Sequence, residues 1–269
     1  MKHPMKRLLM GLLLLSSVLA PFCAPAEDSA FPGRKLFFSV PVMELTELYK
    51  KIDQVVVVDV RSKFEFDTLQ IKGAINIPLA DRAFGSRVSA LRKTNNDKPI
   101  VFYCNGRSCL KSYEAVIKAK TNRVTDVHAF DAGIIEWAKA YPQHAVLLGK
   151  SPVSPSDLID DDKFQAHLLT PDEFVTLISP KTLVIDVRDT FQRADMVVLS
   201  EPVAHFGLDD RVQLSQYIER AKKEKKTLMV FDAVGQQVRW LQYYLKREGL
   251  KDYYFMKGGA DAYTKRAAT

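Results

Sequence analysis

Hydrophobic positions follow two different spacings along the first 140 residues. Mainly apolar runs, typical of buried strands, occupy residues 55–60 and 100–103; a further strand is predicted at 124–130, and a short one at 73–78 ends in a proline. Helical spacing or composition is found at 42–52, 81–93, 112–120 and 133–140, with a short helical turn at 64–66. Strands that alternate with helices in this way predict an α/β fold, in which a parallel sheet carries helices on both faces.

The same pattern recurs in the second half of the chain. Three segments match earlier ones: Leu183–Arg188 matches Val57–Arg61, Thr227–Asp232 matches Pro99–Cys104, and Gly259–Tyr263 matches Gly133–Trp137. Their offsets of 127, 128 and 126 residues are nearly constant, which indicates a tandem duplication. Two prolines and three serines between residues 150 and 160 suggest a linker. We therefore predict domains at 38–148 and 163–269, joined by a linker at 149–162.

The N-terminus has the three regions of a secretory signal peptide. Lys2, Lys6 and Arg7 precede an apolar core at residues 8–20, and the small-residue triplet Ala24-Pro-Ala26 follows. We expect residues 1–26 to be removed, which predicts a periplasmic or secreted protein. The apolar core is shorter than the roughly 20 residues that a membrane-spanning helix needs. Retention of the segment as an uncleaved anchor is the alternative.

Composition and charge limit the classes of function. Hydrophobic residues make up 47% of the chain and charged residues 26%, as in packed globular proteins. Three of the seven net positive charges lie in the predicted signal peptide, so a chain that begins at Glu27 carries +4. This charge argues against a nucleic-acid partner, and no stretch after the signal peptide has the length and apolarity to span a membrane.

Candidate chemistry gathers between residues 99 and 113. A strand-type run delivers Cys104, a short loop follows, and a predicted helix begins at Ser112. Such a unit places a thiol over a helix N-terminus, where unpaired N–H groups and the helix dipole stabilise a thiolate. Arg107 and Lys111 add positive charge. Because Cys23 would leave with the signal peptide, Cys104 and Cys109 would be the remaining thiols; the alternative for Cys104 is an inert buried cysteine.

The second copy lacks this thiol. Asp232 stands at the position of Cys104. An aspartate cannot act as a sulfur nucleophile, and its charge would repel anionic substrates. We therefore predict that the second domain is inactive and that it serves as a structural or partner-binding unit, or as a wall at the mouth of the first domain's site.

Taken together, these segments resemble the rhodanese family. Its hallmarks are a strand ending in Asp-Val-Arg, a following Gly-Ala-x-Asn-x-Pro, a strand ending in the catalytic Cys, and a late Gly-Gly-x-x-x-Trp. This chain has Asp59-Val-Arg61, Gly73-Ala-Ile-Asn-Ile-Pro78, Tyr103-Cys104 and Ala132-Gly-Ile-Ile-Glu-Trp137. The second copy keeps Asp186-Val-Arg188 and Lys257-Gly-Gly259 but has no Gly-Ala-x-Asn-x-Pro. The resemblance implies two tandem rhodanese-like domains, each a small parallel sheet flanked by helices.

The resemblance also implies a sulfurtransferase that carries sulfane sulfur as a Cys104 persulfide. A donor such as thiosulfate would supply the sulfur, and a thiol or another thiophilic acceptor would collect it. The candidate substrate-binding residues are Asn105, Gly106, Arg107, Ser108 and Lys111, with Arg107 first and Lys111 second. Asp59 and Arg61 resemble family residues that brace the sheet edge, and Arg61 is also a candidate for the rim of the site.

The loop departs from the usual Cys-x-x-Gly-x-Arg pattern. Cys109 stands where the arginine is expected, and Gly106 comes one position early. A longer loop is associated with family members that act on phosphate or arsenate, so the choice of substrate stays open. Phosphatase activity is the weakest candidate, because no arginine at the end of the loop would clamp a phosphate.

Two further functions remain open. Cys109 is a candidate resolving thiol, because a curled loop can bring two Cα atoms within the roughly 4.4–6.8 Å that a disulfide requires. A Cys104/Cys109 pair would make the protein a thiol–disulfide or sulfur-relay protein, reset by a periplasmic thiol reductant. The other possibility is a non-catalytic partner-binding module. The sequence predicts no cofactor and no metal site, since the histidines at 128, 144, 167 and 205 lack ligand spacing.

Overall fold

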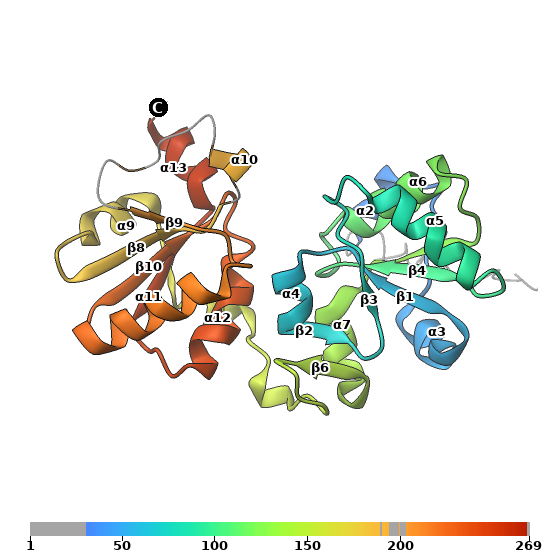
Figure 1. Ribbon diagram of the computed structural model, residues 1–269, viewed down its shortest axis with the longest axis horizontal. Coiled ribbons are helices and arrows are strands. Elements are labelled where there is room, and N and C mark those ends of the chain that lie inside the picture. The colour runs from blue at the N-terminus through green and yellow to red at the C-terminus, as the bar shows by residue number, and fades with distance from the viewer. Residues whose placement is uncertain (1–30, 189, 194–198, 200–202, 268–269) are drawn as a thin grey trace, which may run out of the picture.

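The computed structural model describes residues 31–188, 190–193, 199 and 203–267. Within these residues the chain forms two parallel sheets, each covered by helices (Figure 1). The predicted α/β class, with two parallel sheets flanked by helices, is confirmed. The predicted signal peptide lies outside the described residues. No helix of the described part of the chain is long and apolar enough to cross a membrane.

The first half (residues 31–148) is built on a four-stranded parallel sheet in the order β3-β1-β4-β5. Its strands are β1 Val56–Asp59, β3 Ile75–Asn76, β4 Ile100–Tyr103 and β5 Val127–Phe130. Asp59 pairs with Tyr103 across the two central strands, so β1 and β4 end level with each other. The residues that follow these two strands therefore meet at one edge of the sheet.

Alternate side chains of these strands pack against different helices. Val56, Val58 and Phe102 lie in one apolar cluster with α5 and α6, whereas Val57 and Tyr103 lie in another with α3, α4 and α7. The helical elements of this half are α2 Pro32–Leu36, α3 Leu45–Lys50, η1 Ile52–Gln54, α4 Lys63–Thr68, α5 Phe84–Thr94, α6 Lys111–Thr121, α7 Gly133–Ala140 and η2 Pro142–His144.

A small antiparallel sheet was not predicted from the sequence. It pairs β2 Leu69–Ile71 with β6 Ala145–Leu147. Each strand has only three residues, and the two are far apart in the sequence. Runs this short carry no periodicity that distinguishes a strand from a loop.

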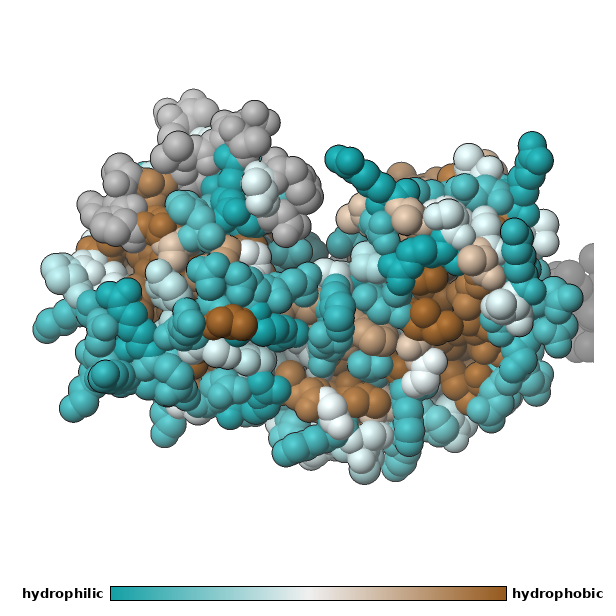
Figure 2. All heavy atoms as spheres, viewed as in Figure 1, coloured by the Kyte–Doolittle hydropathy of each residue, from teal (hydrophilic) through white to brown (hydrophobic). Residues whose placement is uncertain are grey.

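The second half (residues 163–267) contains a parallel sheet in the order β7-β11-β10-β8-β9. Its strands are β7 Leu168–Leu169, β8 Thr182–Asp186, β9 Val203–His205, β10 Thr227–Phe231 and β11 Tyr253–Met256. The helices of this half are α9 Pro171–Leu177, α10 Thr190–Arg193, α11 Arg211–Glu224, α12 Val238–Arg247 and α13 Gly259–Ala267. Two short helices come before its first strand, η3 Pro155–Asp157 and α8 Asp161–Gln165. Helix α11 buries Leu214, Ile218 and Ala221 and presents a mainly hydrophilic outer face (Figure 2).

The two halves share one apolar cluster. Helix α12 lies beside α4 of the first half (Figure 1), and Phe64 meets Tyr244 with 6.4 Å between ring centroids. The connecting segment 149–162 packs into the same cluster, where Val153, Leu158 and Ile159 are buried. The composition of that segment predicted a linker, and the structure shows that it also belongs to the core between the halves.

Strands β1 and β8 each end in a buried ion pair. Arg61 Nη2 lies 2.6 Å from Asp59 Oδ2, and Arg188 Nη2 lies 2.8 Å from Asp186 Oδ2. Burial lowers the pKa of Arg61, but the Asp59 carboxylate outweighs it and holds that pKa above its ordinary value. Asn76 donates to the carbonyl oxygens of Asp59 and Arg61 and so ties β3 to this corner. The predicted bracing role of Asp59 and Arg61 is confirmed; the prediction of Arg61 at the rim is wrong, because its side chain is fully buried.

We expect Asp59→Asn and Asp186→Asn each to lower the free energy of unfolding by about 3–5 kcal/mol, because each removes a buried carboxylate charge that faces a buried guanidinium. Urea denaturation followed by far-UV circular dichroism would measure this. Glu47→Gln, which breaks the exposed pair with Lys51, serves as the control and should cost less than about 1 kcal/mol. Equal losses of unfolding free energy in all three variants would contradict a bracing role for the two buried pairs.

Candidate active site

Cys104 directly follows β4, at the carboxyl edge of the first sheet. Its side chain is buried in the cluster that contains α5 and α6. Its carbonyl oxygen accepts a hydrogen bond of 3.0 Å from the N–H of Ile134, at the start of α7. The β4 strand and the α7 terminus therefore fix the backbone of Cys104, and the loop that begins there (the Cys loop, residues 104–110) extends towards α6.

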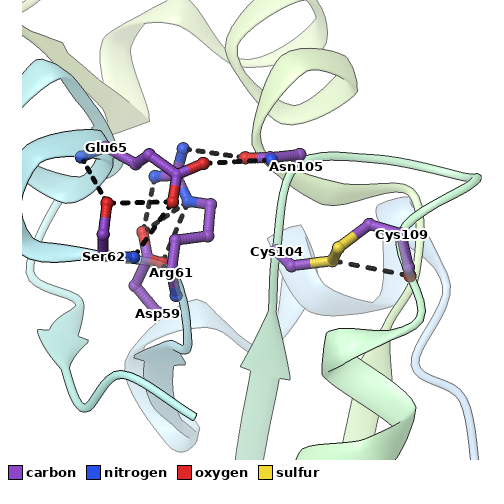
Figure 3. Close-up of a disulfide and its surroundings, with 7 residues drawn as sticks. All are labelled: Asp59, Arg61, Ser62, Glu65, Cys104, Asn105 and Cys109. Atoms are coloured by element: carbon purple, nitrogen blue, oxygen red, sulfur yellow. Dashed lines mark hydrogen bonds and ion pairs between the residues drawn. A yellow bond between two sulfur atoms is a disulfide. The ribbon is translucent and has the colours of Figure 1, made fainter. Parts of the chain in front are cut away.

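Cys104 and Cys109 form a disulfide within this loop (Figure 3). Their Cα atoms are 6.4 Å apart, inside the range that such bridges need. A turn in which the N–H of Cys109 donates to the carbonyl of Gly106 curls the loop back on itself. The Sγ atom of Cys104 also lies 3.5 Å from the carbonyl oxygen of Cys109. A carbonyl oxygen can accept from a neutral thiol but does not stabilise a thiolate, so this contact does not favour the ionised form of Cys104.

Asn105 points away from the disulfide and into a polar network (Figure 3). Its Oδ1 accepts from Arg61 Nη1 at 3.3 Å, and its Nδ2 donates to Glu65 Oε1 at 3.1 Å. Glu65 is buried and closes a capping box with Ser62 at the start of α4. The side chain of Asn105, predicted to bind substrate, therefore holds the loop against the β1–α4 corner.

Gly133 allows α7 to approach the Cys loop. Its φ is +70°, and a Cβ atom there would lie 2.4 Å from the backbone nitrogen of Gly106. Gly259 has the same role in the second half, where a Cβ would meet the carbonyl oxygen of Asp232. These positions explain why the late glycine motif contains glycine at this point in both halves.

Arg107 points towards residues outside the loop. Its Nη2 lies 3.6 Å from Glu136 on α7, and its guanidinium carbon lies 4.9 Å from the ring centroid of Phe31. Phe31 precedes α2, which is anchored because Arg34 donates to the buried Asp131. Arg107 is thus held on an N-terminal segment that the sequence gave no reason to place beside the loop.

The remaining predicted residues lie near the end of the loop. Ser108 and Lys111 are exposed, and Lys111 is the first residue of α6. The helix begins one residue before Ser112, which was expected to open it. Ser112 is instead buried, and its hydroxyl has no hydrogen-bond partner among the described residues.

A cleft of about 870 Å³ borders the Cys loop. One side is formed by Asn105–Ser108 and the other by Val234–Gln236 of the second half, with Lys139, Lys163, Arg239 and Lys257 around it. Among the acids of the cleft, Asp160 pairs with Lys163 and Asp161 with Arg239. The loop of the second half that corresponds to the Cys loop therefore faces it across this cleft.

The carboxylate of Asp232 lies inside the loop that follows it, in the position that a bound anion would take. Its carboxylate accepts hydrogen bonds from the backbone N–H groups of Gly235, Gln237 and Val238. Burial raises the pKa of Asp232, and these N–H donors partly offset that rise. The loop residues 232–238 thus form a backbone anion cradle whose space the chain fills with its own carboxylate.

Sequence reasoning missed three contributors to this site. Glu65 could have been found, because Ser62 and Glu65 have capping-box spacing. Trp240 lies with its ring centroid 4.8 Å from the guanidinium carbon of Arg61, and Phe31 lies beside Arg107. No local pattern in the sequence signals either contact. No cluster of three potential metal ligands occurs within the described part of the chain.

Residues 44–140 match the family model described as "Rhodanese-like domain". Over 91 residues the chain is 35% identical to the HTH-type transcriptional regulator Rv0324 of Mycobacterium tuberculosis, a match that covers 34% of this chain and 38% of that protein. The chain thus spans less than half the length of this relative.

Solved structures are similar over comparable lengths. The human single-domain sulfurtransferase TSTD1 matches with 25% identity and a TM-score of 0.30, over 37% of this chain and 96% of that one. The BH2092 protein of Bacillus halodurans matches with 19% identity and a TM-score of 0.36, over 49% and 94%. The family match covers both β1 and β4 together with the whole Cys loop. Residues 44–140 are therefore similar to a rhodanese-like domain, and Cys104 is the cysteine that follows β4 within them.

Proposed function

We propose that the protein is a sulfurtransferase whose sulfur carrier is Cys104. The observation that carries this proposal is the position of Cys104: it directly follows the central strand of a rhodanese-like domain and begins a loop that lines a cleft. Ligands of open parallel sheets bind at this carboxyl edge. The lining of the cleft carries five cations and three acids, and this excess of positive charge favours an anionic sulfur donor.

The reaction proceeds in two displacements from the reduced protein. The Cys104 thiolate attacks the sulfane sulfur of thiosulfate; a new S–S bond forms, the bond to the sulfonate sulfur breaks, and sulfite leaves with the electron pair. An acceptor nucleophile, such as cyanide or a thiolate, then attacks the outer sulfur of the persulfide. The Cys104 thiolate leaves and is ready for the next donor.

The second half does not carry sulfur in this proposal. Asp232 replaces the cysteine, and its carboxylate already occupies the N–H cradle of its loop. A second anion would have to displace that carboxylate. The second half thus serves as a structural unit, and its Val234–Gln236 segment forms the far wall of the cleft.

A thiol–disulfide or sulfur-relay function is the second candidate, and the Cys104–Cys109 disulfide favours it. In a relay, the Cys109 thiolate attacks the inner sulfur of a Cys104 persulfide, the intramolecular disulfide forms, and hydrosulfide leaves. A dithiol reductant would then supply two electrons and two protons to restore both thiols. Export through the predicted signal peptide would place the pair in an oxidising compartment, with a periplasmic reductant as partner.

We expect thiosulfate to add one sulfur atom to the reduced protein. Intact mass spectrometry after removal of the reductant would detect it. The gain should disappear in Cys104→Ala and accumulate in Cys109→Ala, where no resolving thiol can discharge the persulfide. A sulfur gain that survives Cys104→Ala would contradict the proposal. The absence of any gain in wild type and Cys109→Ala would favour the partner-binding module.

For the redox candidate, we expect the Cys104/Cys109 couple to have a reduction potential between about −270 and −120 mV, the range of thiol–disulfide oxidoreductases. Equilibration in defined dithiol buffers, followed by alkylation and mass spectrometry, would measure it. A potential below about −300 mV is that of a structural disulfide and would rule out cycling of this pair.

If Arg107 binds the donor anion, Arg107→Gln should raise the KM for thiosulfate about two- to fivefold, since one partly exposed charge contributes below about 1 kcal/mol. Glu136→Gln should lower that KM, because it releases Arg107 from its ion pair. Steady-state thiocyanate formation would measure both. Lys111→Gln is the matched control, and a KM that changes most in this variant would move the anion site to the α6 end of the loop.

A further inference from the structure

Trp240 belongs to the second half but contacts Arg61, which donates a hydrogen bond to Asn105 of the Cys loop. It lies on α12, is 2% exposed, and its ring covers the Arg61 guanidinium at 4.8 Å. Its other recorded ring neighbour is Tyr243, with 6.0 Å between centroids. Trp240 also lines the cleft that the Cys loop borders. The Trp240 side chain of the second half therefore contacts both the cleft and the buried cation.

Arg61 connects this contact to the loop. Its Nε and Nη2 are committed to Asp59, and Nη2 also donates to the carbonyl of Leu69. The remaining nitrogen, Nη1, donates to Asn105 Oδ1 at 3.3 Å (Figure 3). Asn105 directly follows Cys104. The guanidinium thus shares the support of the first residue after Cys104 with Glu65, whose Oε1 accepts from Asn105 Nδ2 at 3.1 Å.

We propose that Trp240 is a positioning residue for the Cys loop and acts through Arg61 and Asn105. The second half then does more than form one wall of the cleft: it fixes the geometry in which Cys104 reacts. The consequence for sulfur transfer rests on the proposed function, but the effect on the loop does not.

The physical reason is the orientation of a buried cation. An aromatic face attracts a guanidinium, and the attraction grows when water is excluded from both groups. Without the indole ring, the Arg61 guanidinium can tilt so that its Nη1 moves towards the cleft and donates to water there. Its bond to Asn105, the longest of those that Arg61 makes to side chains, is then the first to be lost.

Simple packing between the halves is the competing explanation, and Arg211 provides the control for it. Arg211 Nη2 lies 3.6 Å from Asp67, and its guanidinium carbon lies 4.0 Å from the Phe64 ring centroid. These contacts join the same two halves, and within the described part of the chain neither Asp67 nor Phe64 forms a hydrogen bond to the Cys loop. A variant at Arg211 therefore weakens the interface without removing the Trp240–Arg61–Asn105 connection.

The test measures how fast iodoacetamide alkylates Cys104 in the reduced full-length protein, read by mass spectrometry of the Cys104 peptide. We expect Trp240→Leu to raise this rate at least about threefold, because a released loop exposes the buried thiol. Trp240→Phe, which keeps an aromatic face, and Arg211→Gln should stay within about twofold of wild type. Thermal unfolding would be recorded for each variant.

A double-mutant cycle with Asn105→Ala separates positioning from general destabilisation. If Trp240 acts through Asn105, the leucine variant should change the rate less than about twofold in the Asn105→Ala background. Additive effects, an equal rise in Arg211→Gln, or an unchanged rate in Trp240→Leu would each overturn the proposal. Trp240→Met replaces the leucine variant if that protein does not fold, and failure of both to fold would make Trp240 a stability residue and also overturn it.

The alkylation readout is independent of the proposed activity. Thiosulfate-dependent thiocyanate formation would be measured on the same proteins. An inactive wild type with an intact coupling cycle would refute sulfur transfer alone. An active wild type with additive alkylation effects would refute the positioning role alone.

Discussion

A fully buried guanidinium must be neutralised and hydrogen-bonded, and Arg61 imposes this requirement on four parts of the molecule. Asp59 supplies the charge from the end of β1, and the carbonyl of Leu69 supplies an acceptor from β2. Asn105 supplies an acceptor from the Cys loop, and Trp240 supplies an aromatic face from the second half. Because none of these groups can move without exposing or orphaning the cation, the sheet edge, the loop and the interface between the halves are held in one arrangement.

The two halves share the same strand ends and glycine positions but close the loop after the neighbouring strand in different ways. Strand β1 of the first half and strand β8 of the second both end in a buried Asp–Arg pair, and both halves place a glycine where a helix approaches the loop. They differ in the residue after the neighbouring strand. In the second half, the Asp232 carboxylate takes three backbone N–H groups and completes its own loop. In the first half, the corresponding loop is closed by the Cys104–Cys109 disulfide, which a reductant can open.

The sequence predicted the features that depend on local chemistry. Apolar runs placed β4 at its observed bounds, helical spacing placed α7, and loop length placed Cys104 and Cys109 within disulfide range. What it missed depends on residues far apart in the chain. Strands β2 and β6 are short and pair across the domain, and the partners of Arg107 and Arg61 come from the N-terminal segment and α12. Such contacts arise when distant segments pack together, and the pattern of residues within a short segment does not indicate them.

The oxidised loop and a sulfur-carrying loop cannot have the same geometry. In the disulfide form the sulfur of Cys104 faces the carbonyl oxygen of Cys109, which repels negative charge, and Arg107 is held by Phe31 and Glu136 outside the loop. A thiolate or a persulfide anion needs donors and cations in those places. Under the proposed function, Cys104 Sγ would have to turn away from this carbonyl after reduction, while the side chain of Asn105 stays bound to Arg61 and Glu65. The fixed end keeps Cys104 at the edge of the sheet, so the proposed sulfur transfer depends on where the segment from Gly106 to Cys109 lies once the disulfide is open.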